Sequence, residues 1–143
     1  MIVTQRAAET TLSVQKAAIN NDEPETISAL KEMRDLAYEL RDRLSGGEVE
    51  ALGELLDRNW QLKRSLTEGI TNTHIDDLYE RVKAAGATGA KLLGAGSSGF
   101  LLVVAPLERQ AAVRAALSHL REVSFRFASR GVHIPLFEPA NGT

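Results

Sequence analysis

The feature that most constrains the fold is a change of hydrophobic period at Gly86. Before this glycine, apolar residues recur every three or four positions, which is the spacing of helices that bury one face. After it, apolar residues run continuously or alternate with polar ones, as they do in strands. A chain that changes period in this way is expected to fold as an α+β domain, with helices packed on a mostly antiparallel sheet.

Start and stop signals divide the first part of the chain into helices. Pro24 suits the first turn of a helix, and Gly46 and Gly47 end the same run. Thr73 is the expected N-cap of a later helix that closes at Gly86, with a capping-box-like acid three residues after the cap. Helices are therefore predicted at about residues 4–20, 22–45, 48–66 and 73–86.

Apolar stripes predict which side chains of these helices face the core. In the second helix the stripe comprises Ile27, Leu30, Ala37, Leu40 and Leu44. In the third helix the inner face comprises Leu52, Leu55, Leu56, Asn59, Trp60 and Leu66. Trp60 is interpreted as a core residue because its large apolar area buries readily.

Four strands and one helix are expected after Gly86. The strands are predicted at 89–93, 99–105, 121–129 and 131–137, and the helix at 107–120. Residues 100–105 are apolar throughout, which predicts a strand covered on both faces. Pro135 makes the last strand an edge strand, because proline cannot donate to a ladder. The fold class is α+β, with a ferredoxin-like four-stranded sheet.

The whole chain, residues 1–143, is expected to form a single domain. Its helical part covers about residues 4–86, and the glycine loop and sheet part covers about 87–137.

A glycine-rich segment joins the first two predicted strands, and it contains a G-x-G-x-x-G pattern. A dinucleotide-binding turn requires a helix after the glycines, whereas here "FLLVVAP" reads as a strand. Two interpretations remain open: the glycines supply only positive φ in a tight connection, or exposed backbone amides contact a phosphate. The segment comprises Gly94, Ala95, Gly96, Ser97, Ser98 and Gly99.

Two lysines are further candidates for contact with a phosphate or an acceptor. Lys91 lies on the strand before the glycines, and Lys63 shares a helix face with Trp60. Either lysine could instead be a solvated surface residue. Asp76 and Asp77 are interpreted as helix-start residues that favour the positive end of the dipole, not as an acid–base pair.

No catalytic or metal-binding residue is predicted in this chain. Ser97 and Ser98 lack a base that the sequence would place beside them. The three histidines are isolated and lack the spacing of metal ligands. They are His74, His119 and His133.

Composition excludes several classes of partner. The 17 basic residues are spread among 19 acidic ones, which gives a net charge of −2 and no basic surface for nucleic acid. The absence of cysteine excludes disulfides and agrees with a reducing compartment. Neither a signal peptide nor a run of about 18 apolar residues is present. We therefore expect a soluble, cytoplasmic protein with no membrane partner.

Residues 75–106, "IDDLYERVKAAGATGAKLLGAGSSGFLLVVAP", resemble the C-terminal region of the GHMP kinases, the galactokinase, homoserine, mevalonate and phosphomevalonate kinase superfamily. The third motif of that family is usually K-L-x-G-A-G-x-G-G; Lys91, Leu92, Gly94, Ala95, Gly96 and Gly99 fit it, while Ser97 and Ser98 stand where the closer relatives mostly carry glycine. Residues 55–80 and 121–137 resemble the branch of sugar kinases that act on heptose phosphates. The likeness extends over about residues 4–137.

This resemblance implies an ATP- and Mg²⁺-dependent kinase that phosphorylates a sugar or a sugar phosphate, with the glycine loop beside the ATP-phosphate loop. Nothing in the chain matches the P-x-x-x-G-L-G-S-S loop of the family's N-terminal domain. We therefore expect a C-terminal domain that needs an N-terminal partner domain and is inactive alone. We expect neither ATP nor Mg²⁺ to bind this chain alone. An apolar face left uncovered by the missing domain could allow the chain to self-associate. The alternative is a non-catalytic α+β module that binds a small ligand or a protein partner.

Overall fold

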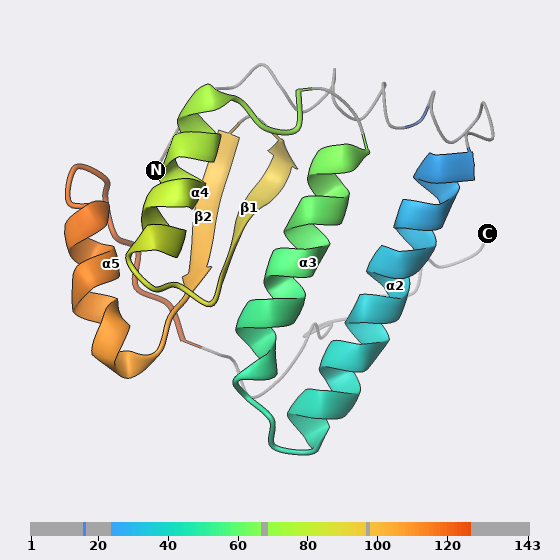
Figure 1. Cartoon of the computed structure of the whole chain (residues 1–143), viewed down its shortest axis with the longest axis horizontal. Helices are drawn as coiled ribbons and strands as arrows, with labels where there is room; N and C mark the ends of the chain where they lie inside the picture. The colour runs from blue at the N-terminus through green and yellow to red at the C-terminus, as the bar shows by residue number, and fades with distance from the viewer. Residues whose placement is uncertain (1–15, 17–23, 67–68, 97, 127–143) are drawn as a thin grey trace, which may run out of the picture.

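A computed structural model describes residues 16, 24–66, 69–96 and 98–126, and it confirms the α+β class. Figure 1 shows helices beside a two-stranded hairpin. In chain order the elements are α2 (Pro24–Ser45), α3 (Ala51–Ser65), α4 (Thr73–Ala84), β1 (Gly89–Gly96), β2 (Ser98–Val104), a 3₁₀ turn (Leu107–Arg109) and α5 (Gln110–Ala116). The helix predicted at residues 4–20 lies outside the described residues apart from Lys16, which is helical.

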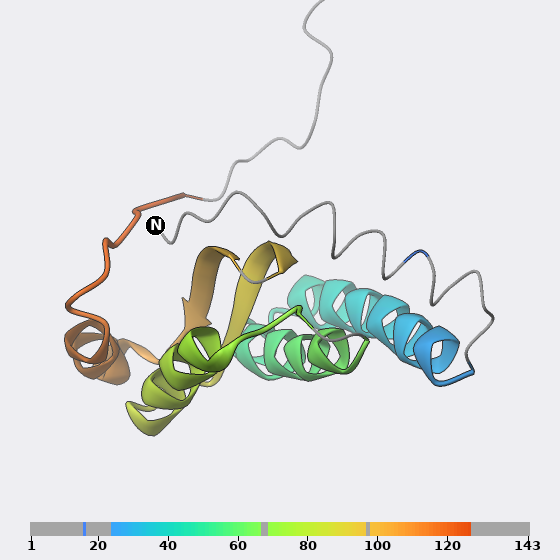
Figure 2. The same ribbon diagram turned by 90° about the horizontal axis from the view of Figure 1, so that it is seen from above.

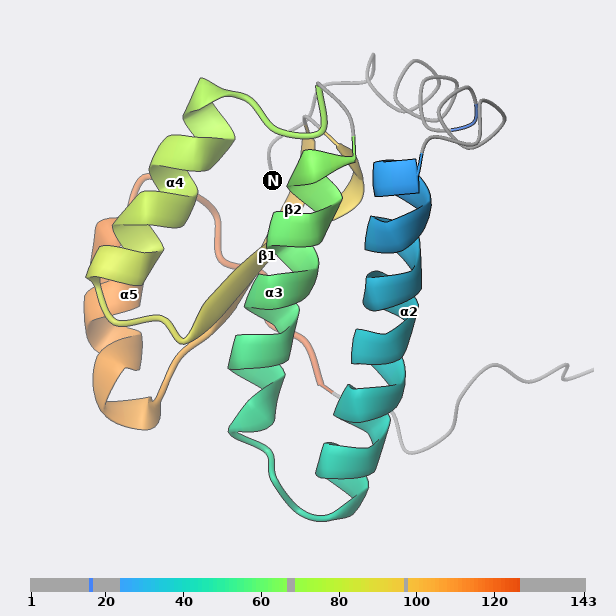
Figure 3. The same ribbon diagram turned by 45° about the vertical axis from the view of Figure 1, so that its right-hand side comes forward.

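The strands β1 and β2 form an antiparallel hairpin. Gly89 pairs with Val104 at its open end and Leu92 pairs with Leu101, while the register shifts between Leu93 and the turn. Helices α3 and α4 pack on one face of this hairpin, α2 packs on the outer side of α3, and α5 packs against α4 (Figures 2 and 3). The sheet and α3 together therefore position the glycine turn.

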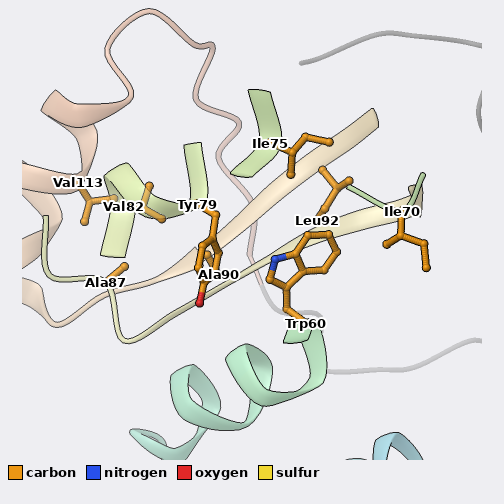
Figure 4. Packing of buried hydrophobic residues seen from close by; sticks show 9 residues of the cluster. All are labelled: Trp60, Ile70, Ile75, Tyr79, Val82, Ala87, Ala90, Leu92 and Val113. Carbon is orange, nitrogen blue, oxygen red and sulfur yellow. The ribbon is translucent and has the colours of Figure 1, made fainter. Parts of the chain in front are cut away.

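The main core lies between the hairpin and the helices α3 and α4. Figure 4 shows the Trp60 ring reaching from α3 towards Leu92 and Tyr79. The Trp60 side chain is 0% exposed, which confirms the interpretation of this residue as core. The buried members of the cluster are Trp60, Ile70, Ile75, Tyr79, Val82, Ala87, Ala90, Leu92 and Val113.

Two glycines allow α3 to lie directly against β1. A Cβ atom on Gly89 would overlap the carbonyl group of Gly53, and one on Gly53 would overlap the side chain of Thr88. Only glycine lets two backbones approach this closely. The contact holds the start of α3 against β1 at the open end of the hairpin, and the last turn of the helix lies near the glycine turn.

The buried face of α2 differs from the predicted stripe. Leu36 is buried, whereas Ala37 and Leu44 are exposed. Among the described elements α2 packs mainly on α3, so its buried stripe is narrow and is centred one residue from the predicted one. Leu36 forms a second, smaller cluster with Ala51 and Leu55 of α3.

The N-cap of α4 is Asn72, so the prediction of Thr73 was wrong. The Asn72 side chain accepts a hydrogen bond from the backbone N–H of Ile75 at 3.0 Å, and Thr73 is the first helical residue. Asp76 does not close a capping box, because its carboxylate accepts from the Thr71 hydroxyl at 2.8 Å. The predicted end of the helix is confirmed, since Gly86 has φ of +98°.

The second half of the predicted sheet is not seen in the described residues. Residues 121–126 are not in a strand, and the segment 131–137 lies outside the described residues. The chain leaves α5 at Ala116, and Glu122 is held by an ion pair with Arg114 at 3.0 Å instead of a strand ladder. Within the described residues, the expected cover on both faces of β2 is incomplete, because Phe100 is 50% exposed and residues 101–105 are half-buried.

No helix among the described residues is both long enough and apolar enough to span a bilayer.

Candidate functional site

The glycine turn is a strand connection with a bulge, not an open six-residue loop. Strand β1 continues to Gly96 and β2 begins at Ser98, and these two residues are paired. Gly94 and Gly99 have φ of +130° and +138°, a conformation that favours glycine. A Cβ atom on Gly99 would also overlap the carbonyl oxygen of Leu93. The interpretation that these glycines supply positive φ is confirmed at Gly94 and Gly99.

The strand bounds also locate the other residues of the glycine motif. Ala95 lies in β1, and Ser97 lies outside the described residues. Contact between any motif residue and a phosphate stays a prediction.

Lys63 connects α3 to the glycine turn by a hydrogen bond. Its Nζ donates a hydrogen bond to the carbonyl oxygen of Gly94 at 2.8 Å, across 31 residues of sequence. The side chain is half-buried, and burial lowers the pKa of the Lys63 ammonium. The structure therefore brings two of the predicted site residues, Lys63 and Gly94, into direct contact.

Lys91, on strand β1, contacts α3 one helical turn before Lys63. Its Nζ donates to Oδ1 of Asn59, which precedes Lys63 by four residues and so shares its helix face. Lys91 is half-buried, not a solvated edge lysine. Burial lowers the pKa of Lys91, and the positive charge of Lys63 lowers this pKa further.

Asn59 was predicted only as an inner-face residue, and its role as a partner of Lys91 was not anticipated. An amide on the inner face of an apolar helix is a signal that it has a polar partner, because buried polar groups are normally hydrogen-bonded. The strand that supplies this partner could not be identified from spacing, since the two residues are 32 positions apart.

The carboxylates of α3 and α4 nearest in sequence to Lys63 are engaged by other cations. Asp57 pairs with Lys83 at 3.4 Å, and Asp76 pairs with Arg64 at 3.0 Å. Within the described residues, neither Lys63 nor Lys91 has an ion pair with a carboxylate. Among the residues that the structure describes, the base of the glycine turn therefore carries two neighbouring positive charges that no carboxylate pairs with.

A polar network around Tyr79 holds α4 against α3. The Tyr79 hydroxyl donates to Oδ1 of Asp57 at 2.9 Å and accepts from Nε2 of Gln61 at 2.8 Å. Burial first, and then the hydrogen bond to Asp57, raise the pKa of Tyr79 to about 12. The guanidinium of Arg64 lies 5.7 Å from the centre of the tyrosine ring. These contacts fix the α3 segment that also carries Lys63.

The acidic pair at the start of α4 has structural partners. Asp76 contacts Thr71 and Arg64, while Asp77 pairs with Arg81 one turn later at 2.8 Å. No group of three or more metal-ligating side chains gathers among the described residues.

Comparison with known proteins assigns the chain to a family. Residues 26–123, well over half of the chain, match the model of the family described as "GHMP kinases C terminal". The chain belongs to this family of GHMP kinase C-terminal domains. The matched residues include the glycine motif, Gly94 to Gly99.

Two curated relatives are sugar kinases by name. The bifunctional fucokinase/GDP-fucose pyrophosphorylase of Arabidopsis thaliana is 34% identical over 79 residues, which cover 55% of this chain and 7% of that protein. The D-glycero-alpha-D-manno-heptose 7-phosphate kinase of Campylobacter jejuni is 24% identical over 109 residues, which cover 75% of this chain and 32% of that protein.

A solved structure shows the same fold. The mevalonate kinase of L. major, in complex with R-mevalonate, superposes with a TM-score of 0.65 at 20% identity. The match covers 81% of this chain and 35% of the mevalonate kinase. This GHMP kinase C-terminal domain thus spans about a third or less of each of these GHMP-type proteins.

Proposed function

We propose that the chain is the C-terminal domain of an ATP-dependent kinase that transfers the γ-phosphoryl group to a hydroxyl of a sugar or a sugar phosphate. The observation that carries this proposal is the family match over residues 26–123, together with relatives named as fucokinase and heptose 7-phosphate kinase. The glycine motif, Gly94 to Gly99, would line the phosphoryl-transfer cleft.

The domain would contribute positioning and positive charge to the reaction. Phosphoryl transfer is accelerated mainly by alignment of the reactants and neutralisation of phosphate charge. Lys63 and Lys91 supply positive charge at the base of the turn, and Lys63 holds the carbonyl group of Gly94. Since the described residues gather no set of metal ligands, Mg²⁺ would be held by ATP and by residues elsewhere in the complete enzyme.

The proposed partner is an N-terminal kinase domain, in the same polypeptide or in a separate subunit. That domain would supply the ATP-phosphate loop and the catalytic residue. The chain alone would be inactive, and as part of an ATP-consuming enzyme it would work in the cytoplasm.

Association tests this proposal. An upstream reading frame with a P-x-x-x-G-L-G-S-S loop identifies the matching N-terminal domain, which is then purified and mixed with the chain. We expect a stable complex in size-exclusion chromatography, and no heat of binding when Mg-ATP is added to the chain alone. Failure of the two folded parts to associate would favour the alternative of a non-catalytic module.

We also propose that residues 131–137, which lie outside the described residues, add a further strand to the sheet. Two features support this: the alternation of Val132, Ile134 and Leu136, and a groove of about 710 Å³ that lies between β2, α5 and the segment after α5, and is lined in part by Leu101, Val113 and Phe125. Backbone chemical shifts and amide exchange test it. Strand-like shifts with slow exchange in this segment are expected, and uniformly fast exchange in the complete enzyme would contradict the proposal.

A further inference from the structure

Two positive charges lie together at the base of the glycine turn. Lys63 comes from the last turn of α3 and Lys91 from β1, and both side chains are half-buried. They are close enough for the charge of Lys63 to lower the pKa of Lys91. Their described contacts are the neutral oxygens of Gly94 and Asn59, not carboxylates.

This arrangement is unfavourable for the isolated domain. Partial burial removes water from each ammonium group, and the two like charges repel each other. The α3 dipole favours a cation in the last turn, which accounts for Lys63 but not for Lys91 on the strand. The fold therefore tolerates an electrostatic cost that a bound anion would remove.

The free donors of the two lysines fit an anion with several oxygens. Each ammonium group has more N–H donors than the one described hydrogen bond uses. A phosphate monoester carries nearly two negative charges at neutral pH and several strong acceptor oxygens, so it matches two cations in both charge and hydrogen bonding. A neutral sugar would leave both charges uncompensated.

We propose that Lys63 and Lys91 bind the phosphate group of the acceptor, so that the substrate of the complete enzyme is a sugar phosphate and not a free sugar. That the bound phosphate belongs to the acceptor rests on the proposed kinase function, whereas the two lysines that bind the anion are residues of this chain. Asn59 and Gly94 position the two ammonium groups on the side of the turn. Because the lysines come from α3 and β1, the packing of these two elements, which includes the close contact of Gly53 with Gly89, sets the spacing of the site.

The test is an NMR titration of the 143-residue chain at constant ionic strength. The probes are inorganic phosphate, a hexose 6-phosphate, the free hexose and Mg-ATP, each balanced with chloride. We expect phosphate and hexose 6-phosphate to shift the amide signals of residues 91–94 and the side-chain signals of Lys63 and Lys91. The free hexose and Mg-ATP should leave these signals unchanged.

Matched variants separate the site from general charge effects. Lys63→Gln and Lys91→Gln are each expected to raise the Kd for hexose 6-phosphate about tenfold or more, as the loss of a charge-assisted hydrogen bond does. Lys63→Arg should retain most of the binding. Lys83→Gln is the control, because Lys83 is paired with Asp57 and should not affect the titration.

Several outcomes would overturn the inference. Absence of shifts with phosphate and hexose 6-phosphate would refute the site, and equal weakening by Lys83→Gln would show general attraction only. Binding of Mg-ATP at these lysines without binding of hexose 6-phosphate would assign the site to the nucleotide and refute the acceptor proposal. Each result is independent of whether an N-terminal domain confers kinase activity, so a failure of the proposed function is recognised separately.

Discussion

At the residue scale, the site depends on hydrogen bonds that join side chains of α3 to β1 and α4. Lys63 contacts the glycine turn, Asn59 contacts Lys91, and Asp57 accepts from Tyr79. The sequence offered both lysines as candidates for phosphate contact; the structure places Lys63 against the glycine turn and Lys91 against Asn59, and phosphate contact stays a prediction. Their partners could not be predicted, because hydrogen bonds between residues about 30 positions apart leave no periodic signal.

The Tyr79 hydroxyl provides a titration prediction. In a Tyr38→Phe variant, Tyr79 is the remaining tyrosine, and its tyrosinate absorbance should appear near pH 12 and not near pH 10. Because the folded-state pKa is raised above the unfolded value, the stability from this group is present below pH 10 and is lost as pH rises towards 12.

Asp57→Asn should move the midpoint of this titration back towards pH 10, because it removes a negative charge that disfavours the tyrosinate. An unchanged midpoint in that variant would show that Asp57 does not contribute to the raised pKa of Tyr79.

At the scale of elements, the fold rests on the direct contact between α3 and β1. The helices α2, α3 and α4 and the β1–β2 hairpin were predicted to within a few residues, because period, proline and glycine signals mark their ends. The buried stripe of α2 lies one residue from the predicted stripe. Leu36 and Ala37 are both apolar, so the sequence does not show which of them is buried; packing on α3 buries Leu36. The close approach of Gly53 and Gly89 leaves no pattern in sequence at all.

Substitution of Gly89 tests this contact. Gly89→Ala places a methyl group against the Gly53 carbonyl, so we expect it to lower the free energy of unfolding by about 2–3 kcal/mol or more. Urea denaturation followed by circular dichroism measures the change. Gly46→Ala is the control, because the new methyl group would meet only ordinary contacts near the Arg43 carbonyl.

If Gly89→Ala and Gly46→Ala cost the same, the backbone approach of α3 and β1 does not limit stability. In that case the spacing of Lys63 and Lys91 would have to be maintained by side-chain packing alone.

At the scale of the whole molecule, the chain belongs to a family of kinase C-terminal domains and spans about a third or less of the relatives it matches, and we propose that it acts as one part of a larger enzyme. The family was identified from "KLLGAGSSG" and its helix–strand setting, and residues 26–123 match the GHMP kinase C-terminal family. The last two strands of the four-stranded sheet were predicted from alternation, and the described residues contain only its first two strands. Alternation marks a segment able to enter a sheet, but pairing also depends on which edge is available.

The most direct test of the central claim is phosphoryl transfer from γ-labelled ATP to a hexose phosphate, measured with the chain, the matching N-terminal domain, and both together in Mg²⁺. The account predicts labelled sugar only when both parts are present. Transfer by the N-terminal domain alone at the same rate, or none by a stable complex of the two folded parts with any sugar or sugar phosphate tried, would contradict it.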